Sequence, residues 1–474
     1  MKLYDSISAT LSKQGVNTIN GDMYDFISNW EEWYRGNVNS FHNYKRKMAD
    51  GKTKKVERLT LNMAKKVSED MAKLVWTEKT KIELGDEEST KKLWAILDSK
   101  KNNFTVNFPE FIEHYMALGT GMLVEYTQND ETLIDYIDAD LIIPFEYSNS
   151  YVSGVATISR SIETVGTTKT WYSLLTLHRF DGKKYTKELQ LYKSTSASDL
   201  GERIELSVKY PELEDTYEYE TETPHFQIFR PNVANNLDKT SPMGISVFAN
   251  HIDKFKALDI KYDNFMNEFI MGKKRILVDR SAVKGAVDPE TGVISQYFDA
   301  DDPTFMATTG MDAQPVKEID FSLRTDAFIS AINADLNYLS AGVGLGQNFY
   351  KFDGAVQGKT ATEVISENSD TYRSKVNHEI IIRDGIYDLV KVICELEGIS
   401  SDNISIEFDD SVIEDKNAEA RQALIEFNAG LIDKVEYFVK AHGMDKEQAQ
   451  ALIKEIESRA PQKPEETEEE PEEE

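Results

Sequence analysis

Residues 342–363 read GVGLGQNFYKFDGAVQGKTATE, and the elements on either side of this stretch can be worked out from it. Its first part is rich in glycine and aromatic residues, which is typical of a loop with a function inside a folded chain. It ends in Thr360-Ala361-Thr362-Glu363, a capping box in which Thr360 and Glu363 satisfy each other's free backbone amides. The stretch therefore predicts a glycine-rich loop over 342–359 and a helix directly after it.

The helix that follows the loop is expected to be long. Apolar residues recur at spacings of three and four as far as Glu397, which corresponds to about 57 Å at 1.5 Å per residue, with Gly385 as a candidate site for a bend. The first half is mostly polar and the second half strongly apolar. We therefore expect the helix to pass from an exposed setting into a core.

Two further helices precede the loop, with a small module between them. An apolar stripe predicts a helix over 245–271, about 40 Å long. Helical spacing resumes at Phe328 and continues to Leu339. Between them, 272–319 contains a strand candidate, RILVD, and a DPETG turn at 288–292. The first helix is expected to pack on one side only, because its other face carries charged residues: Lys254, Lys256, Asp259, Lys261 and Asp263.

The rest of the chain divides by its periodicity. The first hundred residues indicate helices, one with an apolar face from Leu59 to Val75. Short β-type runs from Gly119 to about Arg230 predict an antiparallel meander, closed by a loop at 230–244. A strand candidate, ISIEF at 404–408, precedes two helical patterns within 414–459, separated near Gly443. The glutamate-rich end, 461–474, is expected to be disordered.

The charge of the chain limits its partners. The formal net charge is −29, of which the tail from Pro461 supplies eight glutamates against Lys463, leaving about −22 on the rest. Such a chain repels nucleic acid, so tight groove binding is disfavoured. An acidic wall past which DNA slides without sticking remains compatible with this charge.

A stretch near the N-terminus is positively charged, in contrast to the negative net charge of the chain. It comprises Lys45, Arg46, Lys47, Lys52, Lys54, Lys55 and Arg58. It can be interpreted as a nucleic-acid patch, or as a solvated loop leading into a helix. Asp50 and Glu57 interrupt it and no aromatic-interleaved motif follows, so we favour the loop.

The sequence indicates neither a membrane protein nor a metal or nucleotide site. No apolar run approaches the roughly 20 residues of a bilayer helix, and the first residues lack the order of a signal peptide, so synthesis in a cytoplasm is expected. The single cysteine, Cys394, is expected to be buried. DGAVQGKT at 353–360 has Asp353 where a P-loop needs glycine, and Pro303 interrupts the acidic group 299–302. No catalytic residue, cofactor or metal ligand is expected.

Four segments, taken in order, resemble tailed-bacteriophage portal (head-tail connector) proteins, the siphovirus type from phages of low-GC Gram-positive bacteria. They are VERLTLNMAKKVSEDMAKLVW at 56–76, ALGTGMLVEY at 117–126, GKTATEVISENSDTYRSKVNHEI at 358–380 and DDSVIEDKNAEARQALIEFNAGLIDK at 409–434. The resemblance covers nearly the whole chain. It implies an α+β portal fold and a structural role, not an enzyme.

The resemblance also implies how the chain is divided. By position, 1–243 is the wing of N-terminal helices and β meander, and 360–412 is the long helix with a return to the wing. The helices at 244–271 and 320–341 resemble the stem, and 272–319 the small α/β clip. The remaining segments are the tunnel loop, 342–359, the crown, 413–460, and the acidic tail, 461–474.

Partners and site residues follow from the same resemblance. It implies a homo-oligomeric ring, a dodecamer, in the virion at one capsid vertex, with double-stranded DNA passing non-specifically and assembly in the host cytoplasm. The other implied partners are the terminase large subunit, a head-tail adaptor, and the major capsid and scaffolding proteins. The candidates for DNA contact are Gln347, Asn348, Phe349, Tyr350, Lys351, Phe352 and Lys359; those for terminase or adaptor docking are Lys273, Lys274, Arg275, Asp288 and Glu290.

Two alternatives stay open at this point. The chain could be another virion structural protein, from the capsid interior or the baseplate, which would lack an axial ring. It could also be an enzyme with an unrecognised site, such as a nuclease or transferase, for which a metal-dependent activity would be the sign.

Overall fold

The computed structural model divides the chain into two compact units, Met1–Phe408 and Asp409–Glu474. Each unit is described by itself. The structure describes residues 3–47, 51–272, 275–279, 285–287, 294–296, 305–308, 316–320, 322–353, 361–408, 423–442 and 444–459.

Helices dominate the first part of the larger unit, as the sequence predicts. Two of them, α4 and α6, pack together over a core that includes Val67, Met71, Phe108 and Ile112, all fully buried. The apolar face of α4 begins at Met63, whereas Leu59 precedes the helix and is exposed. The helices are α1 (Leu3–Lys13), α2 (Asp22–Tyr34), α3 (Asn39–His42), α4 (Met63–Val75), α5 (Glu87–Leu97) and α6 (Phe104–Leu118).

The cationic stretch between α3 and α4 is a β-hairpin, so the expectation of a solvated loop was wrong. Strands β1 (Asn43–Lys47) and β2 (Thr53–Glu57) pair antiparallel. Tyr44 lies opposite Val56, and the Arg58 guanidinium stacks on the Tyr44 ring at 4.8 Å. The β-forming residues and this stacking give the ribbon the order that its charges alone do not predict.

The predicted antiparallel meander is confirmed. One sheet has the order β10-β9-β8-β7-β6, with β11 also on β9, and a three-stranded sheet has the order β12-β4-β5. Met122, Ile142, Val155 and Tyr185 belong to a buried core that joins strands of both sheets. The strands are β4 (Gly121–Gln128), β5 (Glu131–Asp138), β6 (Ile142–Ser148), β7 (Tyr151–Val165), β8 (Thr168–Phe180), β9 (Lys184–Ser194), β10 (Glu202–Ile204), β11 (Thr216–Glu220) and β12 (Phe226–Phe229).

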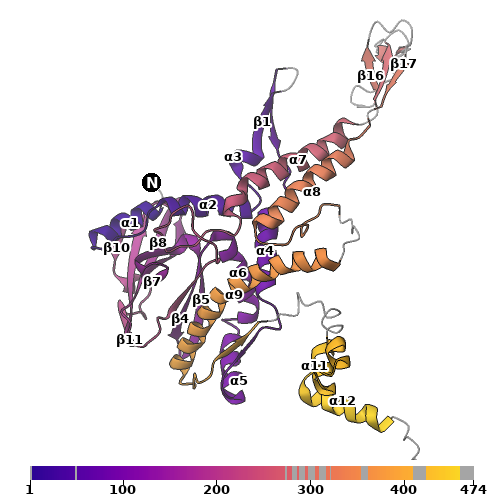
Figure 1. Cartoon of the computed structure of the whole chain (residues 1–474). Coiled ribbons are helices and arrows are strands. Elements are labelled where there is room, and N and C mark those ends of the chain that lie inside the picture. Colours follow the sequence, from indigo (N-terminus) through magenta and orange to yellow (C-terminus); the bar gives the residue numbers. More distant parts are fainter. Residues whose placement is uncertain are drawn as a thin grey trace, which may run out of the picture. The chain divides into compact units, whose positions relative to one another are not determined.

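The two predicted helices around the insert are α7 (Ile252–Met271) and α8 (Thr325–Gly342), which pack side by side (Figure 1). The α7 helix starts later than the stripe predicts. Ile245 and Phe248 are buried, but they precede a 3₁₀ turn at Ala249–His251, because they pack into the body before the helix begins. The α7 helix is therefore about 30 Å long instead of about 40 Å.

The insert between α7 and α8 has five strands in its described part, and RILVD is one of them. Strand β13 pairs parallel with β16 and antiparallel with β17, and β14 pairs with β15. The helical component of the expected α/β insert is not found in the part that the structure describes, and the DPETG turn lies outside it. The strands are β13 (Arg275–Asp279), β14 (Gly285–Val287), β15 (Ile294–Gln296), β16 (Phe305–Thr308) and β17 (Val316–Ile319).

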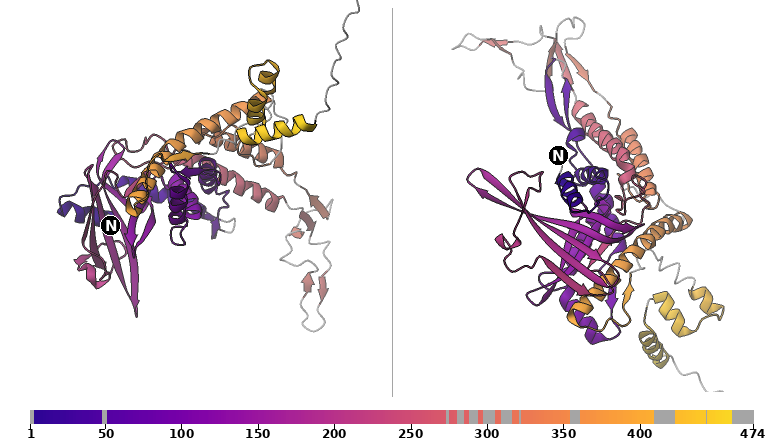
Figure 2. Two further views of the ribbon diagram at one scale, coloured as in Figure 1. Left: turned by 90° about the horizontal axis from the view of Figure 1, so that it is seen from below. Right: turned by 90° about the vertical axis from the view of Figure 1, so that its left-hand side faces the viewer.

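The long helix after the loop is α9 (Ala361–Glu397), as predicted. Its second half is buried, including Ile386, Leu389 and Cys394, and it lies against β4 and β12 (Figure 2). A Cβ at Gly385 would lie 2.4 Å from the Phe229 ring, so this glycine allows the close approach of helix and sheet. The strand that follows, β18 (Ser405–Glu407), pairs with β3 (Lys81–Glu83).

The second unit is helical in its described residues. The helices α11 (Lys434–His442) and α12 (Lys446–Arg459) are separated near Gly443, as expected. Residues 423–428 form a further helical turn that the sequence analysis did not separate from the rest. It ends at Gly430, whose φ of +70° suits glycine. The acidic tail lies outside the described residues.

Candidate functional site

The helix pair α7–α8 is held together by an aromatic contact and by ion pairs. The rings of Phe265 and Phe328 have centroids 5.7 Å apart. The Lys261 Nζ lies 2.6 Å from the Asp335 Oδ2, and Arg324 donates to both carboxylate oxygens of Glu268 at 2.9 and 2.8 Å. Contacts therefore run along the pair from its middle to the end that carries the insert.

The end of α8 lies close to the start of α7. A Cβ at Gly342 would lie 2.4 Å from the His251 ring, at the start of α7. The first glycine of the predicted loop is therefore the last residue of α8, and its lack of a side chain lets the backbone pass close to His251.

A second face of α7 is buried, contrary to the sequence prediction. Asp259 and Asp263 were expected in solvent but are only 3% and 8% exposed. The carboxylate of Asp259 accepts from the backbone N–H of Leu61 at 2.9 Å, and Asp263 accepts from that of Leu59 at 3.3 Å. The helix is therefore packed on two sides, because the chain between β2 and α4 bonds to its acidic stripe.

His42, which directly precedes β1, also bonds to Asp259. The Val38 N–H donates to the His42 Nδ1 at 2.8 Å, so the proton is on Nε2, which donates to the Asp259 Oδ2 at 3.1 Å. Asp259 and Asp263 follow Phe255 at spacings of four on one stripe of α7. That spacing is the signal by which their burial could have been predicted.

The first half of the predicted tunnel loop is packed against α8 and α9. The N–H of Gly346 donates to the Thr371 Oγ1 at 2.9 Å, and that of Tyr350 to the Ser340 Oγ at 3.1 Å. The N–H of Phe352 donates to the Asn333 Oδ1 at 2.8 Å. Side chains of α8 and α9 thus satisfy the backbone of this segment, which gives it a defined path before residue 354.

The predicted DNA-contact residues separate into two groups. Gln347 and Phe349 are exposed, Phe349 to 47%, and Asn348 is half-buried with a φ of +63°. Tyr350 is buried. The remaining members are Lys351 and Phe352, which are half-buried, and Lys359, which lies outside the described residues.

Phe352 is an anchor between the loop and the helix pair. Its ring centroid lies 5.8 Å from that of Phe265 and 6.1 Å from that of Tyr262, both on α7. It therefore points into the subunit, whereas Gln347 and Phe349 of the same loop are exposed.

Tyr350 faces α4. Burial, and then the charge of Asp70, raise the pKa of the Tyr350 hydroxyl far above its ordinary value. The Tyr350 hydroxyl and the Asp70 Oδ2 are both buried without a hydrogen bond of normal geometry to the described residues, while Asp70 pairs with Lys66 through its other oxygen. The phenol thus stays neutral and joins the loop to the acidic side of α4.

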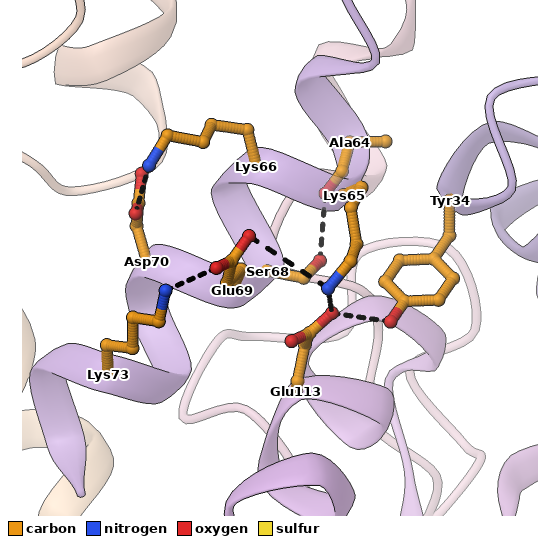
Figure 3. A network of polar contacts seen from close by, with 9 residues as sticks. All are labelled: Tyr34, Ala64, Lys65, Lys66, Ser68, Glu69, Asp70, Lys73 and Glu113. Atoms are coloured by element: carbon orange, nitrogen blue, oxygen red, sulfur yellow. Dashed lines mark hydrogen bonds and ion pairs between the residues drawn. The ribbon is translucent and has the colours of Figure 1, made fainter. Parts of the chain in front are cut away.

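The Lys66–Asp70 pair lies on α4 beside a polar network that reaches α2 and α6 (Figure 3). Glu69 pairs with Lys73, and this hydrogen bond lowers the pKa of Glu69. Lys65 lies between Glu69, at 4.0 Å, and Glu113 of α6. Glu113 also accepts from the Tyr34 hydroxyl, whose pKa is raised by burial and by this carboxylate. The network was not predicted, although its Lys65–Glu69 and Glu69–Lys73 pairs have the four-residue spacing of helical ion pairs.

Most clip candidates cannot be placed. Lys273, Lys274, Asp288 and Glu290 lie outside the described residues, and of Arg275 the structure describes the backbone, at the start of β13.

A cavity of about 780 Å³ between the two larger sheets is a second candidate site. It lies between β4–β5 and the larger sheet, and its lining includes Tyr126, Asp135, Lys187 and Tyr219. Burial raises the pKa of Asp135 and lowers that of Lys187, whose Nζ lies 4.7 Å from the Tyr126 ring centroid. The polar groups that line the cavity contact one another. We therefore interpret them as part of the packing between the sheets and not as groups that carry out a reaction.

The described residues also bear on metal binding and membrane insertion. They contain no group of three His, Cys, Asp or Glu side chains placed to hold a metal ion. None of their helices combines the length and apolar character that crossing a bilayer requires. The near-P-loop from 354 onward and the acidic group 299–302 lie outside the described part.

Comparison with known proteins agrees with the order of these elements. The model of one family, described as "Phage portal protein, SPP1 Gp6-like", matches residues 18–463. A search of the curated proteins finds no match. The family match covers most of the chain and includes the sheets, the α7–α8 pair, the insert and the loop that leads into α9. The chain therefore belongs to the SPP1 Gp6-like family of phage portal proteins.

Proposed function

We propose that twelve copies of this portal protein close into the ring at the capsid vertex, with α7 and α8 as the stem around the DNA channel. Portal proteins of this family are structural components of the virion that form rings and act in DNA packaging. The subunit number and the role of each element go beyond the family match. The packing of α7 against α8 supports the stem role of this pair.

The observation that carries this proposal is the uncovered apolar surface of the helix pair. Ile260 and Ile270 of α7 and Tyr338 of α8 are exposed, to 41%, 60% and 60%. Large exposed apolar groups on packed helices are typical of a surface that another protein covers. In a closed ring, each subunit would cover this surface of its neighbour through a heterologous interface.

The loop after α8 is the proposed sleeve around DNA. Its Gln347 and Phe349 are exposed, while Tyr350 and Phe352 hold its base against α4 and α7. Lys351 and Lys359 are proposed to make transient phosphate contacts. Each additional contact between a cation and a DNA phosphate strengthens binding. An acidic ring with few cations near the axis would therefore bind the DNA backbone weakly and let the DNA pass.

The insert between the stem helices is the proposed clip. Its position between α7 and α8 supports docking of the terminase large subunit during packaging and of a head-tail adaptor afterwards, with Lys273, Lys274, Arg275, Asp288 and Glu290 as candidates. Contact with the major capsid and scaffolding proteins, and assembly in the host cytoplasm, complete the proposal.

Negative-stain imaging of the purified chain, with particle mass from light scattering, tests the ring. We expect closed rings with the mass of twelve subunits and an axial hole wide enough for duplex DNA. A compact monomer at high concentration would contradict the proposal. Rings of another subunit number would contradict the dodecamer alone.

A further inference from the structure

The β1–β2 hairpin concentrates positive charge in a strongly acidic chain. Antiparallel pairing sets Lys45 opposite Lys55 and Arg46 opposite Lys54. Residues directly opposite in an antiparallel pair share a face, so both faces of the ribbon carry cations. Like charges directly opposite each other destabilise a hairpin. The ribbon therefore has an electrostatic cost that contact with an anionic surface would remove.

These cations are exposed, and the residues that the structure describes offer them no ion-pair partner. None of Lys45, Arg46, Lys47, Lys54 and Lys55 lies within ion-pair distance of a carboxylate in the described part of the chain. Elsewhere in the subunit lysines do pair with carboxylates, as Lys91 with Glu87 and Lys101 with Glu131. The hairpin thus differs from a solvated helix face, where lysines find acidic neighbours.

The base of the hairpin is firmly attached to the body, so its charges are held in place. His42, directly before β1, bonds to the buried Asp259, and the Arg58 N–H donates to the His42 carbonyl at 2.8 Å. The Arg58 guanidinium donates to the Phe41 carbonyl at 2.7 Å and stacks on the Phe41 ring at 4.1 Å. Figure 1 shows the ribbon projecting from this base beside α7. A preorganised charged element of this kind suits docking.

We infer that the hairpin docks onto an acidic surface of a second copy of this chain and acts as an electrostatic strap across the subunit interface. The inference rests on the proposed ring. Chains with a net charge of −29 repel one another, so a ring built from them needs local pairing of opposite charges at its interfaces. Glu218 and Glu222 pair with lysines of their own subunit, but Glu212, Glu214, Asp215 and Glu220 beside them are exposed and form one surface that supplies carboxylates for this pairing.

Charge also distinguishes a second copy from DNA as the partner. Five unpaired cations in each of a dozen subunits would neutralise many phosphates, and each contact adds about 0.9 to the slope of log K against log salt. Such a ring would hold DNA instead of letting it pass. Contact with the acidic neighbour uses the same cations without arresting the DNA.

The test compares two variants with the same change in net charge. The first neutralises the hairpin, with Lys45→Gln, Lys47→Gln, Lys54→Gln and Lys55→Gln. The matched control neutralises four exposed lysines of α5 and the turn after it, with Lys91→Gln, Lys92→Gln, Lys100→Gln and Lys101→Gln. Circular dichroism and thermal unfolding of both monomers check that the fold is retained.

Ring formation is then measured by analytical ultracentrifugation over a salt series. We expect the hairpin variant to need at least about ten times more protein for half-assembly than the wild type or the control, because several charge pairs are lost at each interface. Hairpin-variant rings as resistant to dilution and salt as those of the control would overturn the inference. Absence of rings in the wild type would instead contradict the proposed function.

Carbodiimide cross-linking of rings assembled from mixed ¹⁴N- and ¹⁵N-labelled subunits identifies the partner directly. We expect links between hairpin lysines and carboxylates in peptide pairs that carry both isotopes, which proves contact between subunits. Hairpin links confined to one isotope would contradict the inference. So would unchanged assembly combined with loss of duplex DNA binding, which would make the hairpin a DNA contact.

Discussion

Glu125 shows how a single buried carboxyl group can make the stability of the larger unit depend on pH. It lies on β4, is 1% exposed, and neither carboxylate oxygen makes a hydrogen bond of normal geometry with the described residues. Burial raises the pKa of Glu125 to about 8, although the nearby Gln227 amide acts in the opposite direction. The folded chain therefore keeps this side chain protonated at neutral pH.

The Glu125→Gln variant should be less sensitive to alkaline pH than the wild type. Because the pKa of Glu125 is higher in the folded than in the unfolded chain, its contribution to stability is complete below about pH 4.5 and is lost as the pH rises through about 8. Glutamine has the same shape and no charge. Between pH 5 and pH 8.5 we expect the free energy of unfolding to fall by up to a few kcal/mol more in the wild type than in the variant.

Urea unfolding of both proteins at these two pH values measures this difference. Glu205→Gln, at an exposed position, serves as the control and should follow the wild type. An equal pH dependence for Glu125→Gln and the wild type would show that Glu125 is already ionised in the folded chain.

At the scale of elements, the loop after α8 combines fixed and exposed parts. Removing Tyr350 or Phe352 would disturb its packing on α4 and α7 as well as any contact with DNA. A test of DNA contact must therefore spare these two anchors and change only the exposed Phe349 and the two lysines of the loop.

A combined Phe349→Ala, Lys351→Gln and Lys359→Gln variant should assemble into rings like the wild type. We expect it to retain less DNA in filled heads, because base stacking on an aromatic ring and phosphate contacts would both be lost. Genome content per head and DNA release on heating are the measurements. The Lys91→Gln, Lys92→Gln variant controls for net charge on the ring, and genome filling and retention equal to the wild type would contradict a role for the loop.

At the scale of the whole molecule, the subunit carries surfaces of two kinds that suit contact with further copies. The apolar one comprises exposed residues of α7 and α8, and the cationic one is the β1–β2 hairpin beside α7. Within the described part of the chain, the apolar residues are not covered and the cations of the hairpin have no carboxylate partner. The folded subunit is therefore expected to be more stable in a ring than as a monomer.

Ile260→Glu tests the apolar surface. Because Ile260 is 41% exposed in the subunit, burying the rest of its side chain contributes about 1 kcal/mol, and a glutamate there adds the cost of burying a charge, so each interface should weaken by at least about 10-fold. The monomer should keep its thermal stability, because Ile260 is exposed in it. Val165→Glu, at the exposed end of β7, is the control. Light scattering against concentration measures the effect, and unchanged assembly of Ile260→Glu would place this face away from the interface.

The sequence by itself determined the order of the elements and the family. Helical spacing located α7, α8 and α9, alternation located the meander, and the four portal-like segments agree with the family match over 18–463. Such signals are local, since periodicity and capping depend on residues a few positions apart. The same local information predicted the burial of Cys394 and of the second half of α9.

Only the tertiary structure decided which polar groups are inside. Asp259, Asp263 and Tyr350 read as solvent-facing or DNA-facing residues in the sequence, yet each is buried against a segment that lies far away along the chain. Residues 43–47 and 53–57 of the cationic stretch form a two-stranded ribbon, and His42 and Arg58 hold its base in place. Whether a charge is solvated or paired depends on such long-range contacts, and these are set by packing and not by the neighbouring residues.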